Sequence, residues 1–230
     1  FGYYFCAAGH DRTAAVYSTD RLHPLRVFIG HISDVTCVKW HPNSALVATG
    51  SDDRTCRLWD MRVGGCVRYF QGPCCSNITC MDISPNGSML AAGNINSCNQ
   101  AYLWDLGSSK LQAIMCEDRT ETLSTTHCMS FDPSSKVLAT GGDDQIVRTW
   151  NLDNVILPSL AANNVNSTAS AALIPPSHRY YTRYTPIYAL KYGVVPVGVS
   201  GTGRRTVLFG GGPLGNERGT ETTGRKSGSE

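Results

Sequence analysis

The stretch Ala48-Thr-Gly-Ser-Asp-Asp-Arg-Thr-Cys-Arg-Leu-Trp-Asp60 decides how this chain folds, because altered copies of it recur along the sequence. In each copy a run of small and apolar residues leads through a polar turn into a second β-rich run that closes on an aromatic residue. The closing aromatic residues are Tyr17, Trp59, Trp104 and Trp150, which lie 42, 45 and 46 residues apart. A nearly regular internal period of this length indicates a repeat architecture.

Each copy also divides into short strands separated by turns. In the second copy we expect strands at Val35–Trp40, Leu46–Thr49, Thr55–Trp59 and Val67–Phe70, with turns at His41–Ser44 and Ser51–Arg54. No segment has sustained helical periodicity. Four strands in a period of about 40–45 residues are typical of WD repeats, each of which forms one blade of a β-propeller. We therefore predict an all-β fold, a partial WD-repeat β-propeller with about four to five blades of a probable seven.

The second copy carries the most complete set of polar residues. The resemblance to WD repeats implies one buried hydrogen-bonded network, whose members here would be His31, Asp53, Thr49 or Ser51, and Trp59. These groups need one another, because an unpaired buried polar group costs about 1–3 kcal/mol. A His, Asp and Ser set could also suggest a hydrolase, but this spacing encloses the groups inside a blade without an exposed nucleophile. We therefore predict a structural network and no catalytic residue.

The third and fourth copies depart from this pattern. In place of the Gly-His pair the third copy has Gly72-Pro73 and the fourth has Glu117-Asp118. The third also lacks the turn Asp and has a longer hairpin, from Asn94 to Asn99. We expect these copies to be held mainly by packing and to form the softer blades.

The rest of the chain is organised differently. We expect blades over 1–151, a rim insertion or linker over 152–184, strands of a last blade over 185–212, and a disordered tail over 213–230. Residues 152–184 have no clear period, and loops of this length are usually functional or disordered. Because Phe1 to Ala8 already resembles a strand, we expect the chain to begin inside a domain, with part of the ring encoded upstream.

Composition narrows the function classes. Of the 230 residues 17% are charged and the net charge is +2, which gives no basis for a nucleic-acid-binding face. The ten cysteines include no C-x-x-C pair and mostly lie in apolar runs, so we expect buried free thiols and no metal site. The segment Gly219 to Ser227 resembles a phosphate-binding loop with one residue too many and lacks the flanking strand and helix. We predict no cofactor and no membrane segment.

The first seventy residues and the stretch 181–212 also resemble a particular family. The strings Gly2-Tyr-Tyr-Phe5, His10-Asp-Arg-Thr-Ala14, Thr19-Asp-Arg21, Val47-Ala-Thr-Gly-Ser51 and Tyr184-Thr-Pro-Ile187 are similar to those of the WD-repeat TBP-associated factors, the subunit 5 family of TFIID. The resemblance is weak over 71–151, and residues 152–180 and the tail match nothing. A related subunit specific to SAGA-type complexes has similar repeats.

The resemblance implies a nuclear, non-catalytic scaffold in TFIID and, in many lineages, in SAGA. Its implied partners are the histone-fold TBP-associated factors, mainly subunits 6 and 9, with no sequence-specific contact to nucleic acid. The alternative is a generic WD-repeat adaptor, such as a ubiquitin-ligase substrate receptor or a signalling scaffold. Candidate interface residues by exposure alone are Arg12, Arg21 and Arg54, and Tyr180, Tyr181 and Tyr184 form an aromatic group.

Overall fold

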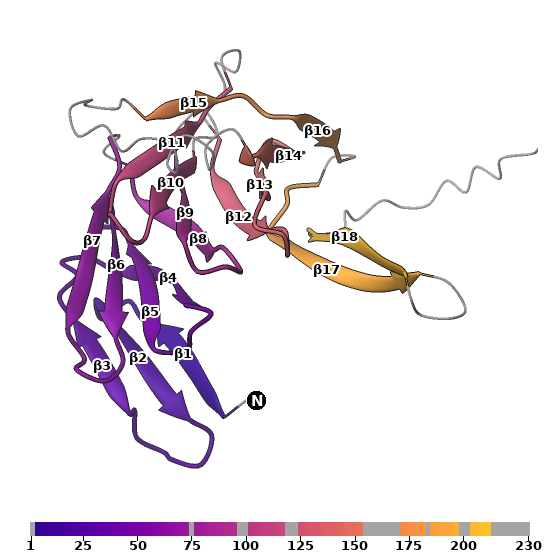
Figure 1. The fold of residues 1–230 in the computed structure, drawn as a ribbon. Coiled ribbons are helices and arrows are strands. Elements are labelled where there is room, and N and C mark those ends of the chain that lie inside the picture. Colours follow the sequence, from indigo (N-terminus) through magenta and orange to yellow (C-terminus); the bar gives the residue numbers. More distant parts are fainter. Residues whose placement is uncertain are drawn as a thin grey trace, which may run out of the picture.

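A computed structural model describes residues 3–73, 76–95, 101–117, 124–153, 171–182, 185–197 and 203–212. Within these residues the chain forms five β-sheets that follow one another in an arc (Figure 1). The all-β propeller prediction is confirmed. No helix in the described part of the chain is long and apolar enough to cross a membrane.

We number the sheets as blades 1 to 5 in chain order. Blade 1 has three strands, β1 (Tyr4–Ala8), β2 (Thr13–Ser18) and β3 (Arg26–Ile29). Blade 2 has four strands, β4 (Val35–Trp40), β5 (Leu46–Ser51), β6 (Thr55–Asp60) and β7 (Cys66–Gln71). Blade 3 contains β8 (Ile78–Ile83), β9 (Met89–Asn94), β10 (Ala101–Asp105), β11 (Leu111–Met115) and β15 (Ala172–Ile174). Blade 4 contains β12 (Thr126–Phe131), β13 (Val137–Gly142), β14 (Ile146–Asn151) and β16 (His178–Tyr181), and blade 5 pairs β17 (Ala189–Val197) with β18 (Gly203–Gly211).

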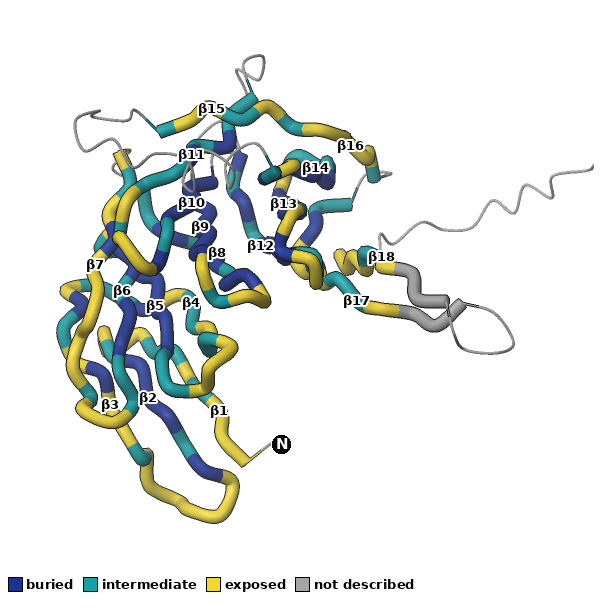
Figure 2. The backbone as a smooth tube through the Cα atoms, in the orientation of Figure 1, coloured by how far each residue is buried: buried dark blue, intermediate teal, exposed yellow. Residues whose placement is uncertain are grey.

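The strands β4, β8, β12 and β17 lie along the concave side of the arc, and the outer strands lie along its convex side (Figure 1). The middle strands of blades 2 to 4 are the most buried, and the outer strand β7 and most loops are exposed (Figure 2). Apolar side chains from neighbouring blades therefore form the core between the sheets. Stacking of Phe28 on Trp59 joins blades 1 and 2, and Phe70 lies against Trp104 between blades 2 and 3.

Hydrogen bonds repeat from one blade to the next on both faces of the arc. We call the side of the turn 52–54 the upper face and the side of the turn 41–45 the lower face. Near the upper face, Thr36 Oγ1 donates to the Ile78 carbonyl at 2.7 Å, and Thr79 Oγ1 donates to the Thr126 carbonyl. Near the lower face, Arg26 Nε donates to the Met61 carbonyl at 3.1 Å, and the equivalent Arg68 donates through Nη2 to the Gly107 carbonyl at 3.4 Å.

The segment expected as a rim insertion supplies two strands. Strand β15 pairs in parallel with β11, and β16 pairs antiparallel with β14 and completes blade 4. Residues 171–182 therefore run across the outer edges of two blades. Residues 154–170, like the tail at 213–230, lie outside the described residues.

A glycine in the second strand of blades 2, 3 and 4 permits close packing of the next blade. A Cβ atom on Gly50 would lie 2.7 Å from both Cys37 Sγ and Ile78 Cγ2. Equivalent additions at Gly93 and Gly141 would lie 2.9 Å from Thr126 Cγ2 and 2.8 Å from Ile187 Cγ2. These contacts are shorter than van der Waals separation, so the inner strand of the following blade can approach this closely only where a side chain is absent.

We predict that Gly50→Ala lowers the free energy of unfolding by about 1–3 kcal/mol, because the extra methyl overpacks the contact between blades 2 and 3. The measurement is the midpoint of urea unfolding. Gly107→Ala is the matched control, since its Cβ would lie 3.6 Å from the nearest heavy atom, an Asp105 carboxylate oxygen. Equal midpoints for the two variants would contradict the packing role of Gly50.

Candidate functional site

Four of the five residues predicted for the polar network meet inside blade 2. Trp59 Nε1 donates to Thr49 Oγ1 at 2.8 Å, and Thr49 Oγ1 lies 2.7 Å from His31 Nε2. His31 Nδ1 lies 2.7 Å from Asp53 Oδ2. The side chains of His31 and Asp53 are each only 1% exposed. The four residues thus form one enclosed chain from the indole to the carboxylate.

The fifth residue, Ser51, takes a different position. Its Oγ donates to the Ser33 carbonyl at 3.2 Å and accepts the backbone N–H of Asp53 at 3.1 Å. Of the two alternatives that the sequence left open, Thr49 is therefore the residue that joins the imidazole to the indole. Ser51 holds the turn that carries Asp53.

Both oxygens of the Asp53 carboxylate accept hydrogen bonds. Oδ2 accepts from His31 and from the Ile32 N–H, and Oδ1 accepts from the hydroxyl and the N–H of Thr55. Burial raises the pKa of Asp53, but the hydrogen bonds from Thr55, His31 and Ile32 together hold that pKa below its usual value. The carboxylate therefore stays ionised although it is enclosed.

The hydrogen bonds assign one proton arrangement to His31. The indole N–H donates to Thr49, the Thr49 hydroxyl donates to Nε2, and Nδ1–H donates to Asp53, so a neutral imidazole satisfies every group. Burial lowers the pKa of His31, against the opposing effect of the Asp53 carboxylate. We therefore assign a neutral His31 at pH 7.

This geometry does not support a hydrolase. The only hydroxyl on the imidazole Nε2 belongs to Thr49, which is completely buried and already accepts the Trp59 N–H. A nucleophile needs access to substrate and donors for an oxyanion. In the part of the chain that the structure describes, no group of three or more His, Cys, Asp or Glu side chains could hold a metal ion.

Blade 3 replaces the network with aromatic packing. Ala92 stands at the position of Thr49, opposite Tyr102 in the strand register. The Tyr102 ring fills the space beside Gly72, where an added Cβ would lie 2.4 Å from the ring, and it lies 5.6 Å from Trp104 between centroids. The third copy is thus held by ring contacts, as the sequence suggested. Residues 96–100 of its long hairpin lie outside the described residues.

Blade 4 differs from the expectation of a copy held mainly by packing. It keeps the bond from Trp150 Nε1 to Thr140 Oγ1 at 2.9 Å. Arg148, only 2% exposed, pairs with Glu117 at 2.7 Å and also with Asp144, and Glu117 pairs in addition with Arg179 of β16. Glu117 stands at the position of Gly30, the first residue of the Gly-His pair, and the fourth copy has buried ion pairs in addition to the bond between tryptophan and threonine.

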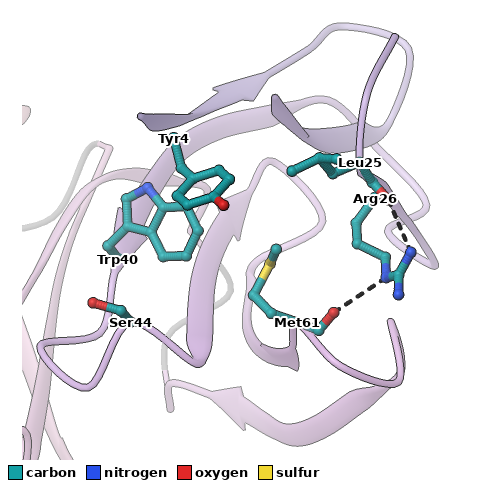
Figure 3. A pocket seen from close by; sticks show the side chains of 6 residues that line it. All are labelled: Tyr4, Leu25, Arg26, Trp40, Ser44 and Met61. Atoms are coloured by element: carbon teal, nitrogen blue, oxygen red, sulfur yellow. Dashed lines mark hydrogen bonds between the residues drawn. The ribbon is translucent and has the colours of Figure 1, made fainter. Parts of the chain in front are cut away.

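A small pocket lies on the lower face between blades 1 and 2 (Figure 3). Its volume is about 340 Å³, and it is lined by Tyr4, Leu25, Arg26, Trp40, Ser44 and Met61. The rings of Tyr4 and Trp40 lie close together on one side, and Met61 lies opposite (Figure 3). The Arg26 guanidinium is turned to backbone carbonyls, including those of Leu25 and Met61. The pocket is therefore suited to an apolar side chain rather than to an anion.

The exposed residues named from the sequence do not gather into one site. Arg12 and Arg54 occupy the same turn position in blades 1 and 2, with positive φ angles of 65° and 71°. Arg21 is exposed in the loop between β2 and β3. Tyr180 and Tyr181 are 55% and 74% exposed on β16, and Tyr184 lies outside the described residues.

We predict that Thr49→Val lowers the free energy of unfolding by about 1–3 kcal/mol, since it leaves the Trp59 N–H and the Nε2 atom of His31 buried without a partner. Thr49→Ser, which keeps the hydroxyl, should cost less. Both variants are compared with the unmodified chain by urea unfolding. If Val and Ser variants were equally stable, the hydroxyl would not be part of a stabilising network.

We predict that the chain loses stability as the pH falls below about 6.5. Because burial lowers the pKa of His31, the unfolded chain takes up a proton there that the folded chain does not. The free energy of unfolding should fall by at most about 1.4 kcal/mol per pH unit for this one proton. His31→Gln should show a shallower slope between pH 7 and pH 5, and an unchanged slope would contradict the neutral imidazole.

Comparison with known proteins agrees with this geometry. Residues 22–60, 64–105 and 121–151 match the model of the WD domain, G-beta repeat. The chain is 37% identical over 166 residues to transcription initiation factor TFIID subunit 5 of Caenorhabditis elegans, which covers 72% of this chain and 25% of that protein. It is 31% identical over 157 residues to the guanine nucleotide-binding protein subunit beta of Arabidopsis thaliana, covering 64% of this chain and 40% of that protein.

The chain thus spans between a quarter and two fifths of the length of these relatives. The matched ranges contain β3 of blade 1, all four strands of blade 2, β8 to β10 of blade 3 and β12 to β14 of blade 4. The chain therefore contains WD repeats of the G-beta type, which form blades of a propeller, and its sequence is similar to that of TFIID subunit 5.

Proposed function

We propose that this chain is part of a non-catalytic scaffold in a TFIID-type transcription complex, and that it acts in the nucleus. The similarity to TFIID subunit 5, which extends over 72% of the chain at 37% identity, carries this proposal. We further propose that its partners are histone-fold subunits of such a complex. A SAGA-type complex is the related possibility within the same proposal.

The physical properties of the blades suit such a role. Cores between the blades, repeated hydrogen bonds near both faces and enclosed polar networks hold the loops in fixed positions. A rigid surface binds a partner without first paying the entropy of ordering its own loops. The most exposed aromatic side chains of the outer edge, Tyr180 and Tyr181, lie on the strand β16. Tyrosine is one of the side chains that contribute most at protein interfaces.

A signalling adaptor is the second candidate. Its support is the 31% identity to a plant guanine nucleotide-binding protein subunit beta over 64% of the chain. The greater identity and coverage of the TFIID relative favour the first candidate.

We predict that the tagged full-length protein, purified from its own cells, carries histone-fold TBP-associated factors identified by mass spectrometry. TBP in the same sample would assign the complex to the TFIID type, and an acetyltransferase would assign it to the SAGA type. An untagged strain is the control for unspecific recovery. Recovery of cullin or signalling partners without any histone-fold subunit would overturn the proposal.

A further inference from the structure

Near the lower face, the concave side of the arc contains a second cavity, whose opening we call the mouth. Its volume is about 350 Å³, and residues from all four inner strands or their turns line it. Lys39 of β4, Asp82 of β8 and Ser130 of β12 occupy the same register position, each opposite an alanine of the second strand. Lys191 follows on β17 and lines the same cavity. Four neighbouring blades thus place one polar side chain each at this mouth.

The carboxylate of Asp82 at the mouth already has partners within the protein. Asp82 Oδ1 pairs with Lys39 Nζ at 3.2 Å, and Asp82 Oδ2 accepts the backbone N–H of Phe131 at 2.9 Å. The Asp82 side chain is 18% exposed. Its charge is therefore balanced by Lys39, and it is held in place by the next blade.

Lys191 is the second lysine that lines the cavity. It is exposed at the cavity, and it forms no ion pair with any residue that the structure describes. The neighbouring Tyr192 N–H donates to Ser130 Oγ at 3.1 Å, which fixes the backbone of β17 against blade 4. The ammonium group therefore extends from a strand held in place, at a cavity whose lining residues carry a formal charge of +1.

The walls around these charges are apolar. Pro85 and Pro133, from equivalent turns of blades 3 and 4, are exposed at the lower edge of the cavity. Phe131 and Leu190 form its deeper surface and are 4% and 9% exposed. A ligand that fills the cavity must therefore present apolar groups together with a negative charge.

We propose that this mouth binds a short acidic segment of a partner protein, with a carboxylate on Lys191 and an adjacent aliphatic or aromatic side chain between Pro85 and Pro133. A carboxylate matches the single free ammonium group, and its apolar neighbour covers the walls that a small inorganic anion would leave exposed. A nucleic-acid strand fits less well, because phosphate backbones are bound by several cations along a groove. The inference rests on the proposed function only in taking the ligand to be a protein.

The test is a selection of random octapeptides displayed on phage against the purified full chain, with the Lys191→Glu chain in a parallel selection. Peptides enriched on the unmodified chain alone should contain Asp or Glu next to an aliphatic or aromatic residue. One such peptide, labelled with fluorescein, should bind at least about tenfold more weakly to Lys191→Glu in fluorescence polarisation. Lys191→Gln should give a smaller loss, and higher salt should weaken binding to the unmodified chain.

Lys110→Glu is the matched control, because Lys110 is also exposed but lies in the loop between β10 and β11. Its affinity for the peptide should remain within about twofold, since that charge lies outside the cavity. Equal thermal unfolding of the variants shows that the fold is kept.

Three results would overturn the proposal. They are the absence of peptides that depend on Lys191, enriched peptides without a carboxylate, and tighter Lys191-dependent binding of a fluorescein-labelled 20-nucleotide DNA strand than of any peptide. The selection contains no TFIID component, so its outcome is independent of the co-purification experiment. Either proposal can fail while the other stands.

Discussion

The hydrogen-bond chain from Trp59 through Thr49 and His31 to Asp53 ties together parts of blade 2 that are far apart in the sequence. His31 precedes the inner strand, Thr49 lies on the second strand, Asp53 lies in the turn and Trp59 lies on the third strand. Because these hydrogen bonds satisfy each buried donor and acceptor of the four side chains, they fix the positions of the turn and of the loop before β4 on the sheet. They also orient the Trp59 ring on which Phe28 of the preceding blade stacks, so the network contributes to the packing between blades.

Three neighbouring blades fill the equivalent buried space with different side chains. Blade 2 uses a neutral imidazole, blade 3 fills the space with the Tyr102 ring, and blade 4 uses ion pairs between Arg148 and two carboxylates. Removing one partner of a buried pair costs more than replacing the whole set by apolar groups. A single substitution in blade 2 would leave orphaned groups, whereas blade 3 lacks the set and blade 4 pairs its two carboxylates with Arg148. Arg148 Nη2 is nevertheless buried with no hydrogen-bond partner among the described residues. The pair of Glu117 with Arg179 also connects blade 4 to its outer strand, which comes from the segment after residue 170.

Much of this fold could be predicted from the sequence because its signals are local. The period of the closing aromatic residues and the polar turns located the blades, and the resemblance of the second copy to WD repeats named the residues of its network. Strands β15 and β16 were missed because β15 pairs with a strand about sixty residues earlier, and β16 joins blade 4 only after the segment 152–177, which has no repeat pattern. The ion pairs of blade 4 were missed for a similar reason, since Glu117 and Arg148 lie 31 residues apart. Their signal was present, because the acidic residue Glu117 replaces the first residue of the Gly-His pair and needs a buried cation nearby.

The polar side chains at the mouth of the second cavity could not be grouped from the sequence, for a different reason. Each inner strand contributes only one of them, and Lys39, Asp82 and Lys191 do not resemble a motif when they are read along the chain. Their relation appears only when the blades are placed side by side. The cores between the blades favour similar apolar residues in every copy, whereas the residues at this mouth make polar contacts that differ from blade to blade: Asp82 accepts from Phe131, and Ser130 accepts from Tyr192. Lys191 forms no ion pair with any described residue, so its charge can be suited to a ligand instead of to the fold.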